Sequence, residues 1–117
     1  METKEMLNII CSVLDEKKAE DIKSINLDGK SIIADYFVIC SGRSTTHVKS
    51  LADNLDEEMS KKYGIEPLRM EGKQDGKWAV VDYGDVIVHT FHQEQRKIYE
   101  IEDLWDDGKN IESYNLK

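Results

Sequence analysis

The histidines are the side chains of this 117-residue sequence that most readily bind a metal or transfer a proton. They are His47, His89 and His92. His89 and His92 lie three residues apart at the expected end of a strand, where their side chains point in different directions. No cysteine lies near them in the sequence, and a zinc site needs several converging ligands. The pattern favours buried, hydrogen-bonded or exposed histidines and predicts no metal site.

A glycine-containing stretch, CSGRSTTHV at residues 40–48, lies between an expected strand and an expected helix. Backbone N–H groups at a helix N-terminus point outward and can hold an anion such as phosphate. The stretch lacks the further glycines, and the Lys before Ser or Thr, of a phosphate-binding loop. A strand-to-helix turn explains the same residues, with Gly42 supplying conformational freedom and Ser44 capping the helix.

Asp82 and Asp85 form another candidate site, because they flank a Tyr-Gly pair. If that pair forms the turn of a hairpin, the two carboxylates are cross-strand neighbours on one face. Paired carboxylates can bind Mg²⁺ in sites of phosphoryl transfer. Aspartate is also common in turns, where it hydrogen-bonds to the backbone. A nucleotide-binding or nucleotidyltransferase-like enzyme that uses Ser41, Gly42, Asp82 and Asp85 is therefore the alternative hypothesis for function.

The chain is acidic, with 24 acidic and 16 basic residues and a net charge of −8. Binding to a nucleic-acid backbone needs a basic stripe, and the sequence contains no compact cluster of Lys and Arg. Direct nucleic-acid binding is therefore not expected as the main source of affinity. An acidic chain favours a basic protein partner, because opposite potentials steer the encounter.

The apolar segments are short, and this determines the expected compartment. The apolar runs extend over only a few residues, so the sequence predicts no membrane span. The first ten residues lack the apolar core of a secretory signal. Cys11 and Cys40 have no metal-ligand spacing and are expected to be buried free thiols. We expect a protein of the cytoplasm.

Hydrophobic periodicity predicts the helices and strands that position these side chains. Apolar residues recur at helical spacing over 3–19 and again over 45–63, where Gly64 is the end signal. One or two short helices are expected over 92–105. Strands are expected at 22–28, 36–40, 67–72, 77–83 and 85–91.

The order of these elements, α-β-β-α-β-β-β-α, indicates an α+β fold with a mixed sheet. The segment 36–71 has the strand-helix-strand pattern of a parallel crossover. We expect one domain over residues 1–106. The remaining residues, 107–117, are expected to form a loosely ordered tail.

The stretch WAVVDYGDVIVHTF, residues 78–91, is typical of a hairpin with two largely apolar faces. With the turn at 83–84, the pairs on one face are Trp78 with His89, Val80 with Ile87, and Asp82 with Asp85. The other face carries Ala79, Val81, Val86, Val88 and Thr90. Three helices must cover both faces of the sheet, so we expect a partly uncovered patch that contains Trp78 or Tyr83. Aromatic residues are typical of protein interfaces and also of cores, so docking face and core stay open as alternatives.

Five segments of the chain resemble the ribosomal silencing factor, or Iojap, family, and together they cover about residues 4–106. Their length and order make the resemblance more specific than a single short motif. The segments are AxDIxxxxL at 19–27, DYFVICSGRSxxHVxxLADxL at 35–55, Glu71-Gly72, WxxxDYGDVIVHxF at 78–91 and RxxYxxExLW at 96–105.

The resemblance implies a role in translation. Members of this family bind the large ribosomal subunit through ribosomal protein uL14 and block joining of the small subunit, which lowers translation when nutrients are scarce. Their fold is similar to a nucleotidyltransferase core without catalytic residues, which implies no enzymatic activity and no cofactor. Members often form homodimers, so a homodimer is a further expectation.

The hairpin is expected to supply the contacts with the partner. The expected contact residues are Trp78, Tyr83, Asp85, Val86 and Val88. Secondary contacts are expected at Asp35, Tyr36, Arg43 and His89. Tyr99 and Trp105 are expected to support the core.

Overall fold

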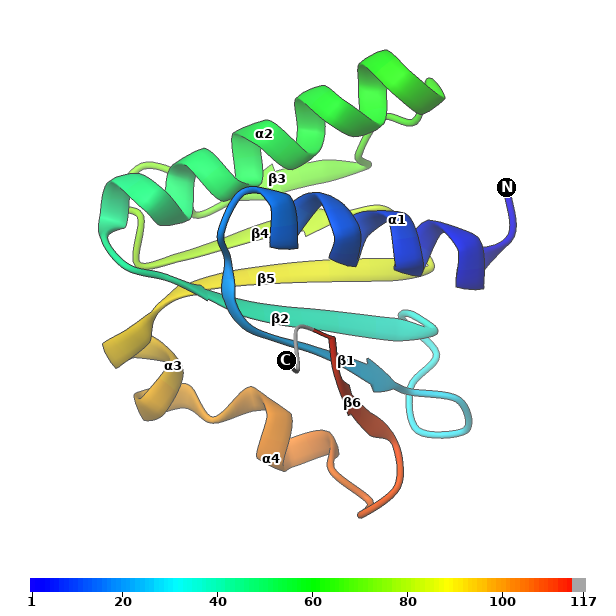
Figure 1. Cartoon of the computed structure of the whole chain (residues 1–117). Helices are drawn as coiled ribbons and strands as arrows, with labels where there is room; N and C mark the ends of the chain where they lie inside the picture. Colours follow the sequence, from blue (N-terminus) through cyan, green and yellow to red (C-terminus); the bar gives the residue numbers. More distant parts are fainter. Residues whose placement is uncertain (115–117) are drawn as a thin grey trace.

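The computed structural model describes residues 1–114, which form a mixed six-stranded sheet with helices on both faces (Figure 1). The helices are α1 (Thr3–Glu16), α2 (Thr45–Tyr63), α3 (Gln93–Tyr99) and α4 (Ile101–Trp105). The strands are β1 (Glu20–Asn26), β2 (Tyr36–Gly42), β3 (Arg69–Glu71), β4 (Trp78–Asp82), β5 (Val86–His92) and β6 (Ile111–Ser113). The α+β class with a mixed sheet is confirmed. The helices α3 and α4 lie within 92–105, where one or two short helices are expected, but the predicted element order lacks the strand β6.

The strand order across the sheet is β3-β4-β5-β2-β1-β6. β2 pairs in parallel with β5, and the other neighbouring strands are antiparallel. The predicted crossover over 36–71 connects strands that run in the same direction but are not neighbours, because β4 and β5 lie between β2 and β3. β2 and β5 carry nearly continuous buried residues and therefore occupy the centre of the sheet.

The end of the chain is more ordered than predicted over its described part. Residues 111–113 pair with residues 23–25 as the edge strand β6. The amide of Asn110 guides this approach, since it donates to Trp105 O at 2.7 Å and to Asn26 O at 2.9 Å. Three residues are too few to show an alternating pattern, so periodicity does not predict β6. Residues 115–117 of the predicted tail lie outside the described residues.

The boundary signals of α2 are confirmed. Ser44 caps the helix by accepting a hydrogen bond from His47 N at 3.0 Å, and Gly64 ends it with φ of 66°. α1 is shorter than predicted. It ends at Glu16, and Lys18 then adopts a φ of 68° that turns the chain toward β1. α2 therefore begins just after the end of β2, and α1 leads into β1.

The β4–β5 hairpin has a different register from the predicted one. The observed pairs are Trp78 with Phe91, Val80 with His89, and Asp82 with Ile87. Gly84 and Asp85 form the turn, because Tyr83 N donates to Val86 O at 2.9 Å. Gly84 has φ of 87°, as glycine does at the first central position of a type II′ turn. The two-residue shift keeps the strand residues on their predicted faces, but it removes the predicted pairing of Asp82 with Asp85.

Two hydrophobic clusters lie on opposite faces of the sheet. One lies beneath α1 and α2 and contains Val81 and Val88, both fully buried. The other contains Ile39 and Phe91 and packs against α3 and α4. These last two helices are short, so the second cluster is only partly covered. Its half-buried members on β2 and β4 are Phe37, Trp78 and Val80.

Candidate docking face

The partly covered face of the sheet is the candidate functional site, and we call it the hairpin face. Its side chains point away from α1 and α2, because alternate residues of a strand face opposite sides. Its residues are Phe37 from β2, Trp78, Val80 and Asp82 from β4, and Ile87, His89 and Phe91 from β5. The presence of half-buried Trp78 here fits the predicted uncovered patch.

Trp78 is held in place by its ring and by its N–H group. The indole stacks on Phe91 with ring centroids 4.8 Å apart, and it lies 4.9 Å from the ring of Tyr99. Its Nε1 donates a hydrogen bond to His89 Nδ1 at 3.1 Å. The indole therefore has a fixed orientation, so a partner would lose little conformational entropy in binding to it.

His89 is an uncharged hydrogen-bond acceptor in this arrangement. Burial lowers the pKa of His89 to about 4, although the nearby Asp82 carboxylate acts in the opposite direction. The ring is therefore neutral at neutral pH. Its Nδ1 accepts the hydrogen bond from the indole N–H, and the proton of the ring is on Nε2. Phe37 packs edge-on against this ring at 4.8 Å. Since His89 is 7% exposed, its geometry fits the positioning of Trp78 better than broad contact with a partner.

Acidic side chains lie at the turn of the hairpin. Asp82 is nearly buried and orders the turn, since it accepts hydrogen bonds from Gly84 N at 2.8 Å and from Arg69 Nε at 3.3 Å. Asp85 is exposed and accepts a hydrogen bond from Thr3 Oγ1 at 3.2 Å. Asp85 is therefore the aspartate of the turn that presents its charge to solvent.

Three of the predicted contact residues lie on the helix-covered face of the hairpin. Val86 and Val88 are fully buried, and Tyr83 is 9% exposed. Burial raises the pKa of Tyr83 above its ordinary value, and its hydroxyl has no hydrogen-bond partner among the described residues. The prediction of Val86 and Val88 as direct contacts conflicts with this burial, because β5 is covered on the side they face. They support the hairpin from behind.

The predicted secondary contacts on and beside β2 lie at opposite ends of that strand. The backbone N–H groups of Asp35 and Tyr36 donate to Asp85 O at 2.8 Å and 3.0 Å, so both residues adjoin the hairpin turn. Arg43 follows the other end of β2, roughly 20 Å away along the strand. The structure therefore brings Asp35, Tyr36 and Asp85 together and leaves Arg43 apart.

The four residues of the enzyme hypothesis are not brought together. Ser41 and Gly42 end β2 beside the end of β5, whereas Asp82 and Asp85 lie at the start of β5. Ser41 Oγ accepts a hydrogen bond from Arg96 Nη1 at 2.9 Å. A Cβ on Gly42 would lie only 2.8 Å from a side-chain carbon of α2, so the glycine permits close packing. No single nucleotide site can use all four residues.

The histidines outside the hairpin face form hydrogen bonds with the backbone, and the cysteines are buried in the core. His47 Nδ1 accepts a hydrogen bond from Arg43 N at 3.0 Å, and His92 caps α3. Cys11 and Cys40 are free and buried, and burial raises the pKa of both thiols to about 12. Within residues 1–114, no group of three His, Cys, Asp or Glu side chains is arranged to hold a metal. None of the helices in this part of the chain has the length and apolarity to cross a membrane.

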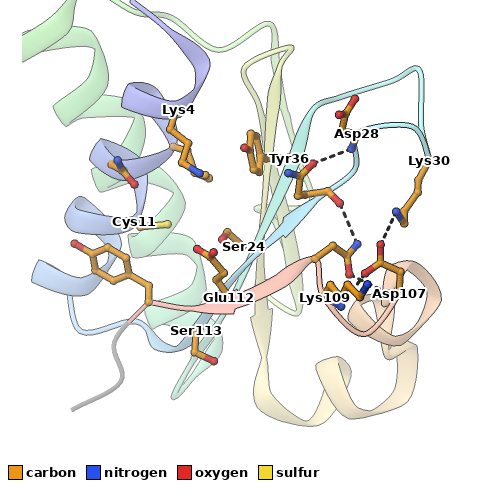
Figure 2. A pocket seen from close by; sticks show the side chains of 15 residues that line it. Lys4, Cys11, Ser24, Asp28, Lys30, Tyr36, Asp107, Lys109, Glu112 and Ser113 are labelled. Atoms are coloured by element: carbon orange, nitrogen blue, oxygen red, sulfur yellow. Dashed lines mark hydrogen bonds and ion pairs between the residues drawn. The ribbon is translucent and has the colours of Figure 1, made fainter.

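Two of the hollows that the described residues form lie outside the hairpin face. One, of about 440 Å³, lies between α1, β1 and the C-terminal segment, and Figure 2 shows Lys4, Ser24, Tyr36 and Glu112 along it. Lysines and carboxylates both line this hollow, and the pair Lys30–Asp107 closes at 2.6 Å. The mixed charge gives it no clear preference for an anion such as a nucleotide phosphate. The other, of about 640 Å³, adjoins Arg96.

Arg96 joins the two short helices to the sheet. It is 7% exposed, and its Nε and Nη2 donate to the Glu102 carboxylate at 3.1 Å and 2.9 Å. Its Nη1 also donates to Asp21 O at 2.8 Å. The sequence shows Arg96 only as one letter of a motif, and no periodicity predicts its burial. Phe37 is the other residue of the site that the sequence does not single out. It lies two residues before Ile39 in the same strand, and this spacing indicates that both side chains lie on the same face of the sheet.

Comparisons with known proteins agree on one family. Residues 1–117 match the family described as ribosomal silencing factor during starvation. Ribosomal silencing factor RsfS of Halalkalibacterium halodurans is 39% identical over 112 residues, which are 96% of this chain and 95% of that protein. The mouse protein named mitochondrial assembly of ribosomal large subunit protein 1 is 34% identical over 101 residues, 85% of this chain and 44% of that protein.

A solved structure supports the fold. The crystal structure of a protein from Chromobacterium violaceum matches with a TM-score of 0.87 at 29% sequence identity. The match covers 100% of this chain and 95% of the other. The mixed sheet and its helices are thus an arrangement that an experimentally determined relative shares.

Proposed function

The chain belongs to the ribosomal silencing factor family, and on this premise we propose that it binds the large ribosomal subunit through ribosomal protein uL14 and blocks joining of the small subunit. This competition would lower translation when nutrients are limiting. The mouse relative, named for assembly of the large ribosomal subunit, supports the choice of subunit. The proposed compartment is the cytoplasm, where a bacterial silencing factor would meet ribosomes.

The observation that carries the proposal is the hairpin face. It presents a preoriented tryptophan beside Phe37 and Val80, all half-buried, on a side of the sheet that α1 and α2 do not cover. Partly exposed aromatic and aliphatic side chains with fixed geometry are typical of interface hot spots. The predicted contacts divide accordingly. Trp78, Asp35 and Asp85 lie where a partner on the hairpin face could reach them. Tyr36 instead points to the α1 side of the sheet, beside Lys4. The buried residues Tyr83, Val86, Val88 and His89 support the surface.

The mechanism needs binding and no chemistry from this chain. If the hairpin face and the small subunit compete for one surface of the large subunit, occupancy alone prevents joining, and its extent follows from concentration and affinity. The residues of the enzyme hypothesis are divided between two ends of the sheet, which supports this choice. We also propose that the fold is a nucleotidyltransferase-like core without catalytic residues. A homodimer that covers the hairpin face would compete with the ribosome.

A subunit-joining experiment tests this function. Purified small and large subunits are mixed with or without the protein, and formation of complete ribosomes is followed by light scattering and sucrose-gradient sedimentation. The proposal predicts that joining decreases as the protein concentration rises, and that added small subunits relieve the effect. Unchanged joining at concentrations that saturate the large subunit would contradict it. A melting temperature raised by nucleotide and Mg²⁺ would instead favour the enzyme hypothesis.

A further inference from the structure

Two adjacent isoleucines are fully or largely exposed in the loop between β1 and β2. Ile32 has a relative exposure of 105% and Ile33 of 69%. Leu68, before β3, is exposed to 74% and lies near the hairpin turn, where its side chain faces Gly84. Single exposed apolar residues are common, but several at one end of a sheet indicate a contact surface.

The loop holds the two isoleucines outward by fixing its own base. Leu27 and Ala34, at its two ends, are buried in the second hydrophobic cluster. The backbone N–H groups of residues 30 and 31 donate to Leu27 O at 2.8 Å and 3.2 Å, and Ile33 N donates to Ser31 Oγ at 3.0 Å. The exposed side chains are therefore presented by an organised loop, which lowers the entropic cost of binding.

Backbone hydrogen bonds connect the loop to the hairpin turn. Leu27 N donates to Asp35 O at 2.8 Å, and Asp35 N donates to Asp85 O at 2.8 Å. Figure 1 shows this loop, in cyan, at the same end of the sheet as the turn between β4 and β5. A partner on the hairpin face that extends past Asp85 would thus meet Ile32 and Ile33.

The charges around the loop indicate what kind of surface it fits. Asp28, Asp35 and Asp85 are exposed, and none of them has an ion-pair partner among residues 1–114. Lys30 is already paired with a carboxylate. The other cations nearby are Lys4, over the ring of Tyr36, and Lys109, which lines the same hollow as Asp28. The loop thus has an apolar tip, Ile32 and Ile33, surrounded by aspartates. Such a surface is complementary to a basic protein surface with an apolar recess, and a phosphate backbone would repel it.

We propose that Ile32 and Ile33 form a second anchor for the ribosomal protein, inserting into an apolar recess on its basic surface beside the site of the hairpin face. This inference rests on the proposed function and adds a segment to its interface. The tip would bury apolar area on binding, while the aspartates would set the orientation and speed of the encounter.

The test compares two double variants that each replace two largely exposed apolar side chains. Ile32→Ser with Ile33→Ser removes the loop anchor. Ile98→Ser with Leu104→Ser removes side chains of 68% and 77% exposure from α3 and α4 and is the matched control. Since all four side chains are exposed, both variants should fold, which circular dichroism and urea unfolding check. We expect the loop variant to bind purified large subunits at least about tenfold more weakly and the control to bind like the wild type.

A single charge change distinguishes a protein surface from an RNA surface. Asp35→Asn removes a charge that has no ion-pair partner among the described residues. Against a basic protein it should weaken binding severalfold at low salt, whereas against RNA it should strengthen binding. Tighter binding of this variant would overturn the choice of partner surface.

The outcomes also separate this inference from the function beneath it. If the wild type fails to bind large subunits, the proposed function fails. If the wild type binds and the loop variant binds equally well, the function stands and the second anchor is rejected. Equal loss in the loop variant and the control would also reject it, because the effect would then follow apolar area rather than position.

Discussion

At the scale of single residues, Trp78 and His89 depend on each other. The indole N–H needs an acceptor, and His89 can serve only while its ring is neutral, because a protonated imidazole carries donors on both nitrogens. Burial keeps the ring neutral by lowering its pKa to about 4. The orientation of Trp78 is thus linked to the protonation of His89.

This linkage predicts a pH dependence of stability. The pKa of His89 is lowered from 6.5 to about 4, so between these values the unfolded chain binds a proton that the folded chain does not. The contribution of His89 to the free energy of unfolding is therefore constant above about pH 6.5 and falls by on the order of 3 kcal/mol as the pH decreases toward 4. Urea unfolding monitored by tryptophan fluorescence at a series of pH values measures this loss.

His89→Gln is the control for that measurement, because glutamine can still accept the indole hydrogen bond but does not titrate. The carboxylates titrate in both proteins, so the difference between the two curves reports on His89. Curves that remain parallel from pH 7 to about pH 4 would show that His89 is not responsible.

At the scale of elements, the position of α3 and α4 depends on Arg96. These helices are short and their outward side chains are exposed, so little apolar burial holds them. The guanidinium of Arg96 in α3 binds Glu102 of α4, and it connects both helices to the sheet through Asp21 of β1 and Ser41 of β2. Because Tyr99 of α3 packs on Trp78, the same arginine helps to shape the edge of the hairpin face.

Arg96→Ala should therefore destabilise the fold by about 3–5 kcal/mol, since it leaves a carboxylate without its cation and buried acceptors without donors. Chemical denaturation measures the change. Lys97→Ala, at an exposed neighbouring position, is the control and should change stability by less than about 0.5 kcal/mol. Equal effects of the two substitutions would contradict the role given to Arg96.

The elements also show what the sequence could predict. Alternation placed the residues of β4 and β5 on the correct faces even though the register was shifted, because a shift of two residues preserves the faces. Alternation does not show which face the helices cover, and for this reason the sequence predicts contacts at Val86 and Val88, which the structure places on the covered face. The pairing of β6 and the burial of Arg96 depend on contacts between distant segments, which leave no local pattern.

At the scale of the whole molecule, the net charge of −8 should act on the ribosome as a long-range effect. Lower salt strengthens the attraction to a basic ribosomal protein, and it also strengthens the repulsion from ribosomal RNA. The change of affinity with salt concentration therefore measures which of the two effects dominates. We expect affinity for large subunits to decrease with added salt, and mainly through slower association. Stopped-flow binding at several salt concentrations measures this, and faster association at high salt would contradict it.

The central claim is that the hairpin face is the docking surface for the large ribosomal subunit. Co-sedimentation of the protein with purified large subunits tests it most directly, with wild type compared with Trp78→Ala and with folding of the variant checked by circular dichroism. The account predicts that the wild type co-sediments and that the folded variant binds at least about tenfold more weakly. A folded Trp78→Ala protein that co-sediments as well as the wild type would contradict the claim.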